Sequence, residues 1–288
     1  MQTISVVIPT FHRYEALADT VQDLLRQTVP PRQIIVVDNT RLAERQQPSY
    51  LASTPTTECL YISSSAEGRV NVARNEGLRQ VTANYVILFD DDMSLPDSCL
   101  EQFLKVHAEG WDAVTGMIIE RGVLLENHRG GDRPFWEVLK HGHGASRGNT
   151  IAVPSSFVSL RTEMIRELGF LDEAFIYSYD DYDLGYRIWQ AGYTLIHDPR
   201  PTAHHLKLRS GGSRKELTGA KRRLNKYTAK YYFVAKHFNR RAVVIEFVSD
   251  LLLAACNFRW NIPRAINEFL LATKGLRGSV TYARPADH

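Results

Sequence analysis

The chain has 288 residues, of which 44% are hydrophobic and 23% charged, which is typical of a globular protein and excludes a disordered or fibrous one. Its three cysteines are far apart and odd in number, so they fit neither a disulfide framework nor a zinc knuckle. The formal net charge of +3 hides an uneven distribution, because residues 207–241 contain twelve Lys or Arg and one acid. This basic flank suits nucleic acid, anionic lipid or a phosphate-bearing substrate, and a solvated helix face is the alternative.

Strands and helices alternate through the first half of the chain. The patterns predict strands at 4–9, 33–37, 60–63 and 85–89, and helices at 14–28 and 70–80. This alternation predicts a parallel α/β sheet, in which ligands bind outside the carboxyl ends of the strands. Thr10, Asp38 and the acids that follow residue 89 would lie along that edge.

Three consecutive carboxylates, Asp90, Asp91 and Asp92, directly follow the apolar strand at 85–89. Adjacent carboxylates repel one another, and a hard divalent cation such as Mg²⁺ or Mn²⁺ would neutralise them. An acidic turn that caps the next helix is the simpler alternative.

Beyond these acids the predicted order becomes mixed, with a helix at 98–109 and a strand at 113–119. The Gly- and His-rich residues 122–148 are typical of a mobile loop or lid. A second acidic group, Asp180, Asp181 and Asp183, begins a helix that would end near Gly192. A helix N-cap explains one of these carboxylates, which leaves another available as a general base.

Together these motifs resemble those of the family 2 glycosyltransferases. The matching pieces occur in the family's order: SVVIPTFHR at 5–13, IIVVDN at 34–39, GRVNVARNEG at 68–77, FDDD at 89–92, GFLDE at 169–173 and the pair Asp180 and Asp181. Each piece alone is common, but six in order between residues 3 and 212 are specific. The resemblance implies an α/β glycosyltransferase A-type fold, with a Rossmann-like mixed central sheet flanked by helices and a C-terminal helical extension. It also implies inverting, metal-dependent sugar transfer from a nucleotide-diphospho-sugar to an acceptor hydroxyl.

The resemblance assigns donor-binding roles to individual residues. Asp38 would hydrogen-bond the nucleotide base, and Asp90 would contact the ribose or sugar. The remaining donor-binding candidates border the base, the donor sugar or the acidic cluster: Pro9, Thr10, Phe11, Arg13, Arg74, Asn75 and Asp91. For Arg13, capping of the following helix is the alternative.

The metal and the catalytic base are implied in the same way. Asp92 would hold manganese or magnesium against the donor diphosphate, with His205 as a further ligand and the adjacent His204 as its alternative. Asp181 matches the family's catalytic base and would accept the proton of the acceptor hydroxyl. Weaker candidates for the acceptor site or a phosphate-binding loop are Trp136, Asp180 and Arg214.

We expect a catalytic nucleotide-sugar-binding domain over residues 1–212 and a basic amphipathic helical extension over residues 213–288. In the extension, one apolar helical stripe is predicted for Leu217, Leu224, Tyr227 and Tyr231. Because acceptors in this family are often lipid-linked, the resemblance points to synthesis of cell-surface polysaccharide or glycolipid. The chain begins without a signal-peptide pattern, so we expect a cytoplasmic protein. The basic amphipathic helices and the lipid-linked acceptors of the family predict peripheral attachment to the inner face of the plasma membrane. The basic flank has no interleaved recognition motif, so we expect no nucleic-acid partner.

Two other functions share some of these features. A sugar nucleotidyltransferase would use a similar sheet and similar acids, but it needs a Gly-rich loop after the first strand, where this chain has Pro9 to Arg13 and no glycine. A non-catalytic nucleotide-sugar-binding protein would not need an acid at the position of Asp181.

Overall fold

The computed structural model describes residues 2–46, 48–120, 123–124, 147–150, 152–176, 178–208, 212, 219–258 and 262–282. The chain forms two compact units, one of Met1–Asp172 with Asp181–Ser213 and one of Glu173–Asp180 with Arg214–His288. The second unit thus includes a short segment from before residue 212. The functional assignment of the two predicted domains stays a prediction.

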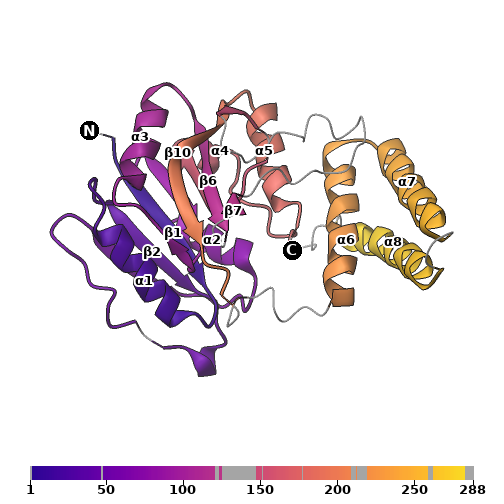
Figure 1. The fold of residues 1–288 in the computed structure, drawn as a ribbon, viewed down its shortest axis with the longest axis horizontal. Helices are drawn as coiled ribbons and strands as arrows, with labels where there is room; N and C mark the ends of the chain where they lie inside the picture. The colour runs from indigo at the N-terminus through magenta and orange to yellow at the C-terminus, as the bar shows by residue number, and fades with distance from the viewer. Residues whose placement is uncertain are drawn as a thin grey trace. The chain divides into compact units, whose positions relative to one another are not determined.

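Within the described residues, the first unit contains one mixed sheet of ten strands (Figure 1). Its order is β3-β2-β1-β4-β9-β6-β10-β5, with β7 paired to β6 and β8 paired to β10. The strands are β1 Ile4–Thr10, β2 Gln33–Asp38, β3 Glu58–Ser63, β4 Tyr85–Phe89, β5 Met93–Ser94, β6 Ala113–Glu120, β7 Val123–Leu124, β8 Gly148–Asn149, β9 Phe157–Arg161 and β10 Leu195–His205. Strands β3, β2, β1 and β4 are parallel, and β9 lies antiparallel between β4 and β6. Since β6 and β10 are parallel to each other, the carboxyl ends of β1, β2, β3, β4, β6 and β10 share one edge.

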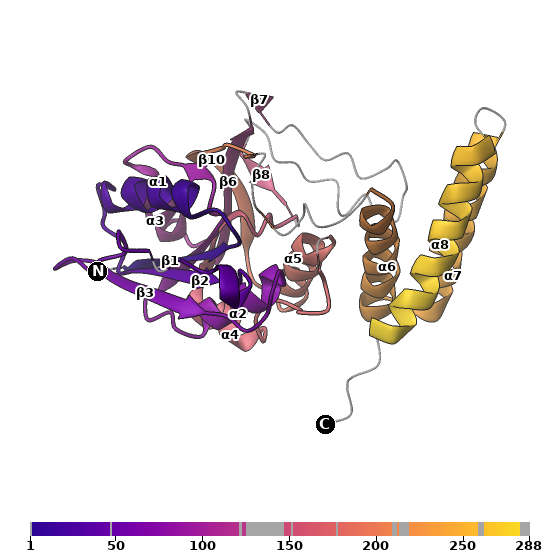
Figure 2. The same ribbon diagram turned by 90° about the horizontal axis from the view of Figure 1, so that it is seen from below.

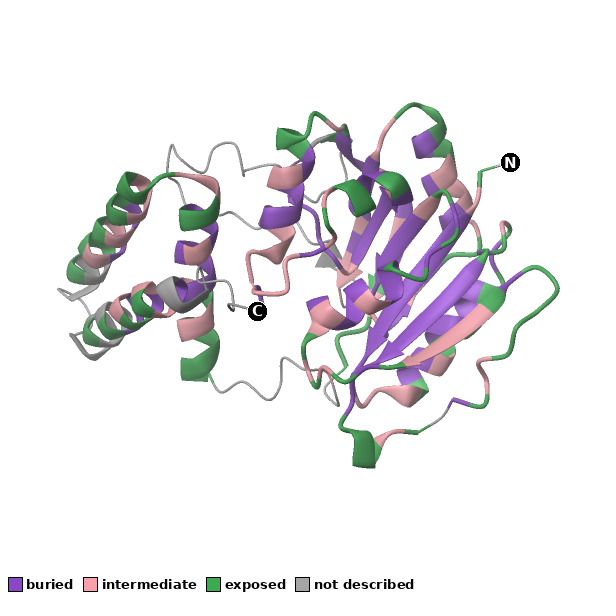
Figure 3. Cartoon of the chain, turned by 180° about the vertical axis from the view of Figure 1, so that it is seen from behind, coloured by how far each residue is buried: buried purple, intermediate pink, exposed green. Residues whose placement is uncertain are grey.

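Helices cover both faces of this sheet (Figure 2). They are α1 Tyr14–Leu25, α2 Val70–Leu78, α3 Cys99–Ala108, α4 Thr162–Glu167 and α5 Asp180–Gln190, with a short 3₁₀ helix at Leu42–Glu44. Alternate strand residues face opposite helices, so that Val6 packs with α1 and α3 while its neighbour Val7 packs with α2, α4 and α5. The central strands are therefore buried on both sides, as their continuous apolar sequences predict (Figure 3).

The predicted strands and helices of the first half are confirmed, with small shifts at their ends. The predicted mixed central sheet flanked by helices is confirmed as well, because a mixed sheet lies between two helical layers. The sequence patterns did not predict strands β9 and β10 or helix α4.

The second unit contains α6 Gly219–His237, α7 Arg240–Phe258 and α8 Ile262–Tyr282. Helices α6 and α8 pack closely, since a Cβ at Gly275 would lie 2.5 Å from the Cβ of Tyr227. Tyr231, from the predicted apolar stripe, is completely buried. None of the helices in the described part of the chain is long and apolar enough to cross a membrane.

Candidate active site

The acids that follow β4 are held by residues from the end of β1 and the loop after it. Thr10 Oγ1 donates to Asp91 Oδ2 over 2.8 Å. Arg13 Nη1 lies 3.0 Å from Asp91 Oδ1 and 2.9 Å from Asp92 Oδ2, so one guanidinium bridges two carboxylates. Burial raises the pKa of Asp91 to about 7, although the charge of Arg13 acts in the opposite direction.

Asp92 is the most deeply buried of the three acids, with no exposed surface. Burial alone would raise its pKa, but the imidazole of His205 and the charge of Arg13 outweigh burial and lower the pKa of Asp92. His205 Nε2 lies 3.2 Å from Asp92 Oδ1. Within the described residues this oxygen is buried, and beyond this contact with the imidazole it has no hydrogen-bond partner.

Asp90, Asp92 and His205 each offer one ligand atom, and these atoms lie within 4.8 Å of one another. Two carboxylates and an imidazole form a donor set that suits a divalent cation, and such an ion would bind the buried oxygen of Asp92, which has no hydrogen-bond donor of its own among the described residues. His204, the alternative ligand, is exposed, and alternation along β10 turns it away from His205.

Two residues that follow β10, Leu208 and Gly212, contact this edge. The backbone N–H of Leu208 donates to Asp92 Oδ2 over 3.2 Å, and the N–H of Gly212 donates to the carbonyl of Phe11 over 2.9 Å. Gly212 has φ +82°, and a Cβ there would lie 2.6 Å from Arg13 Nη2. The positive φ therefore favours glycine at this position, and a larger residue would also displace the guanidinium of Arg13.

Asp181 lies in the first turn of α5 and is bound by Ser155, which precedes β9. The backbone N–H and the hydroxyl of Ser155 both donate to Asp181 Oδ1, each over 3.0 Å. The same hydroxyl accepts a hydrogen bond of 2.7 Å from Arg74 Nη1, while Arg74 Nη2 donates to Asp90 Oδ1 over 2.9 Å. A continuous chain of hydrogen bonds thus joins the candidate metal ligand Asp90 to the candidate base Asp181.

Asp38 ends β2 and is completely buried. Its Oδ2 accepts hydrogen bonds from the hydroxyls of Tyr14, over 2.7 Å, and Tyr61, over 2.8 Å, and its Oδ1 accepts one from the N–H of Thr40 over 2.9 Å. Burial and the neighbouring carboxylate raise the pKa of Tyr61, which keeps its hydroxyl protonated as a donor. The predicted role of Asp38 in base binding stays a prediction, and a base N–H would have to share or replace one of these donors.

The other predicted donor-binding residues have different surroundings. Pro9 lies inside β1 opposite Val37, and Phe11 is 6% exposed beside the ring of His12. Asn75 is buried and forms two hydrogen bonds with the backbone of Leu171, so it also fixes the segment before α5. Asp180 is the first residue of α5. Trp136 and Arg214 lie outside the described residues.

Three residues at this edge were not predicted from the sequence as parts of the site: Ser155, Tyr14 and Tyr61. Their signal is only a hydroxyl near the end of a predicted element, which is too common to select them.

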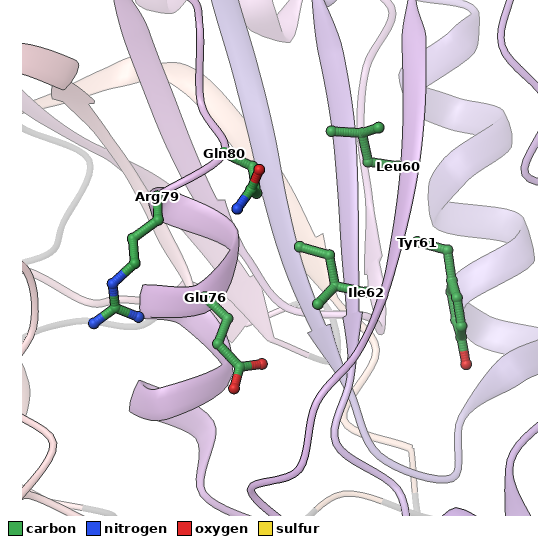
Figure 4. Close-up of a pocket in the computed structure, with 6 residues that line it drawn as sticks. All are labelled: Leu60, Tyr61, Ile62, Glu76, Arg79 and Gln80. Carbon is green, nitrogen blue, oxygen red and sulfur yellow. The ribbon is translucent and has the colours of Figure 1, made fainter.

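A cavity of about 320 Å³ lies elsewhere, between β3 and α2, and its lining includes Leu60, Ile62 and Glu76 (Figure 4). No acid of the candidate site lines this cavity. The candidate site is therefore identified from the chemistry of its side chains, and not from the position of a pocket.

Comparison with known proteins gives the family. Residues 5–169, more than half of the chain, match the family model described as Glycosyl transferase family 2. The chain belongs to this family. An uncharacterized glycosyltransferase of Bacillus subtilis (strain 168), YwdF, is 28% identical over 102 residues, which are 35% of this chain and 37% of that protein.

A solved structure shows the same fold. The crystal structure of GalNAc-T7 with UDP, GalNAc and Mn²⁺ matches with a TM-score of 0.61 and 14% sequence identity, over 99% of this chain and 58% of that one. The chain therefore spans less than two thirds of the length of each of these proteins. At 14% identity the likeness supports the A-type fold and not a shared substrate.

Proposed function

We propose that this family 2 member is an inverting, metal-dependent glycosyltransferase, which moves a sugar from a nucleotide-diphospho-sugar to an acceptor hydroxyl. The observation that carries the proposal is the placement of Asp90, Asp92 and His205 beside one another, with Asp181 tied to them through Arg74 and Ser155. An acid-rich cation site and a separate carboxylate are the two parts that this reaction needs.

Asp90, Asp92 and His205 would hold the divalent cation. The imidazole favours manganese over magnesium, which prefers oxygen ligands. The solved neighbour was crystallised with Mn²⁺ and UDP, which supports manganese and a nucleotide-sugar donor for this chain. When bound, the cation would neutralise negative charge on the leaving diphosphate.

Asp181 would act as the general base. Its Oδ1 is fixed by Ser155, and Oδ2 would accept the proton of the acceptor hydroxyl as that oxygen attacks the anomeric carbon. A single displacement of this kind inverts the anomeric centre and needs no protein nucleophile. Ser155 would be a positioning residue, because it touches the base and not the substrate.

The donor would lie along the carboxyl edge of the sheet. The segment Pro9 to Arg13 and Asp38 would border the base, and Arg74 and Asn75 would support the sugar end, as the family resemblance implies. Synthesis of cell-surface polysaccharide or glycolipid, with a saccharide or lipid-linked acceptor, is the context that we propose on the same ground.

The test is release of nucleoside diphosphate from a panel of sugar nucleotides with Mn²⁺, which requires no known acceptor. We expect hydrolysis of one donor, loss of this activity in Asp92→Ala and a strong reduction in Asp181→Asn. Asp19→Asn, which changes an exposed carboxylate of α1, is the matched control and should retain the wild-type rate.

Calorimetry of donor binding completes this test. Asp181→Asn should still bind the donor, since the base does not contact it. Full activity in Asp92→Ala, or no donor bound by the wild-type protein, would contradict the proposal. In the second case a non-catalytic role or nucleotidyl transfer would become the better explanation.

A further inference from the structure

Helix α7 exposes an apolar face. Among the α7 side chains that the structure describes, those that are exposed are all arginine or apolar: Arg240, Arg241, Val244, Ile245, Val248, Leu252, Leu253 and Ala255. Ile245 and Leu252 are 67% and 62% exposed. A surface helix of a globular protein ordinarily has polar and charged residues on its exposed face.

The two acids of α7 face inward instead. Glu246 and Asp250 are 5% and 8% exposed. Lys230 of α6 donates to Glu246 Oε1 over 3.1 Å and also to Asp250, and the Tyr231 hydroxyl donates to Asp250 Oδ2 over 2.8 Å. Because these carboxylates are bound in the interior of the second unit, their negative charge is removed from the outward side of α7.

Helix α8 continues the same pattern. Its exposed residues, among those with described side chains, are Ile266, Leu270, Lys274 and Arg277, whose spacing places them on one helix face. Helices α7 and α8 are connected through residues 259–261 and lie side by side (Figures 1 and 2), so they run antiparallel. The exposed apolar residues Ile266 and Leu270 therefore lie nearer the connected end of this hairpin, and the cations with described, exposed side chains lie toward the other end.

We propose that the α7–α8 hairpin binds the surface of an anionic lipid bilayer, with its exposed apolar residues at the acyl boundary and its cations at the headgroup phosphates. Residues 219–282 contain twelve Lys or Arg and three acids, two of which are Glu246 and Asp250. This charge is complementary to anionic lipid, whereas it would repel a second copy of the same surface. An exposed apolar strip combined with cations is the pattern of interfacial helices, which lie on a membrane without spanning it.

The exposed surface of α7 and α8 is not the stripe predicted from the sequence, which lies on α6. Tyr231, one residue of that stripe, is completely buried. The exposed surface belongs to the second unit alone, so a negative result for sugar transfer would not count against membrane binding, and the reverse also holds.

The experiment is cosedimentation of the full chain with phosphatidylcholine vesicles, with and without phosphatidylglycerol. We expect binding that requires the anionic lipid and weakens at high salt. The double variant Ile245→Gln/Leu252→Gln should bind about tenfold or more weakly, because two large apolar side chains no longer leave water. Arg240→Glu/Arg241→Glu should lose the binding that phosphatidylglycerol confers.

Leu42→Gln is the matched control, since Leu42 is 75% exposed but lies in the first unit. It should bind vesicles as the wild-type protein does. Circular dichroism would verify that each variant is folded, which is expected because only exposed positions change. Absence of wild-type binding, or equal binding by the apolar double variant, would overturn the proposal. A wild-type dimer that Ile245→Gln/Leu252→Gln converts to a monomer would overturn it in favour of a second copy.

Discussion

Replacement of Ser155 by alanine tests the hydrogen-bond chain that holds the candidate base. The change removes the hydroxyl that donates to Asp181 Oδ1 and accepts from Arg74, but it keeps the backbone N–H bond to the same carboxylate. A hydrogen bond to a charged group contributes about 1.5–3 kcal/mol. If this bond orients Asp181 in the transition state, kcat should fall by roughly 10- to 100-fold, while the KM for the donor should change little.

The assay is steady-state release of nucleoside diphosphate with the donor identified by the panel. Ser156→Ala is the matched control, because it removes a hydroxyl from the adjacent residue. In a double-mutant cycle, Ser155→Ala should slow Asp181→Asn no further, since both changes act through one group. A kcat within twofold of wild type, or a loss that appears only in the KM for the donor, would refute a positioning role for Ser155.

Three further changes probe other parts of the molecule. His205→Ala should weaken Mn²⁺ binding measured by calorimetry by about tenfold or more, because the candidate site loses its imidazole; unchanged affinity would remove His205 from the ligand set. Burial lowers the pKa of His107 to about 4, below its ordinary 6.5. As the pH falls, the imidazole is therefore protonated in the unfolded chain before it is protonated in the folded one. Stability from neutral His107 should be complete above pH 6.5 and fall by about 3 kcal/mol as the pH drops to 4; urea unfolding of wild type and His107→Gln should show this difference in slope. Lys230→Met should lower the free energy of unfolding by about 3–5 kcal/mol, because Glu246 and Asp250 stay buried without their cation; thermal denaturation showing no loss would contradict this.

Local patterns predicted much of the first unit. Strands β1, β2 and β4 are continuous apolar runs that are buried on both faces, so their sequences alone indicate parallel strands of a covered sheet. The polar residues at their ends, such as Thr10, Asp38 and Asp90, were predicted to share one edge because parallel strands end together.

Strand β9 was missed because its signal depends on distant partners. It inserts antiparallel between β4 and β6, and its pairing of Phe157 with Phe89 joins residues far apart in the chain. Ser155 is carried to Asp90 and Asp181 by that pairing, so no local pattern selects it. The surroundings of Asp38 were missed for the same reason, since Tyr14 comes from α1 and Tyr61 from β3.

The second unit shows where a periodicity argument is incomplete. Apolar spacing in α6 correctly indicates a helix, and Tyr231 lies on its buried side. In α7 the sequence has apolar residues on most sides, so spacing cannot tell which side faces the core. The buried ion cluster around Lys230 determines which side of α7 faces the core, because Lys230 binds Glu246 and Asp250 there. That cluster forms between helices and is not visible in the sequence of either one.

Arg74 connects the two halves of the proposed chemistry. Its two terminal nitrogens donate to different partners, Asp90 on one side and Ser155 on the other, and it is 4% exposed. A planar guanidinium can hold both directions at once, whereas a lysine presents a single point charge. The position of the base is thereby coupled to the carboxylate that would contact the cation. A change in Asp90 on donor or metal binding would be transmitted to Asp181 through two intervening side chains, so the two ends of the site are not independent.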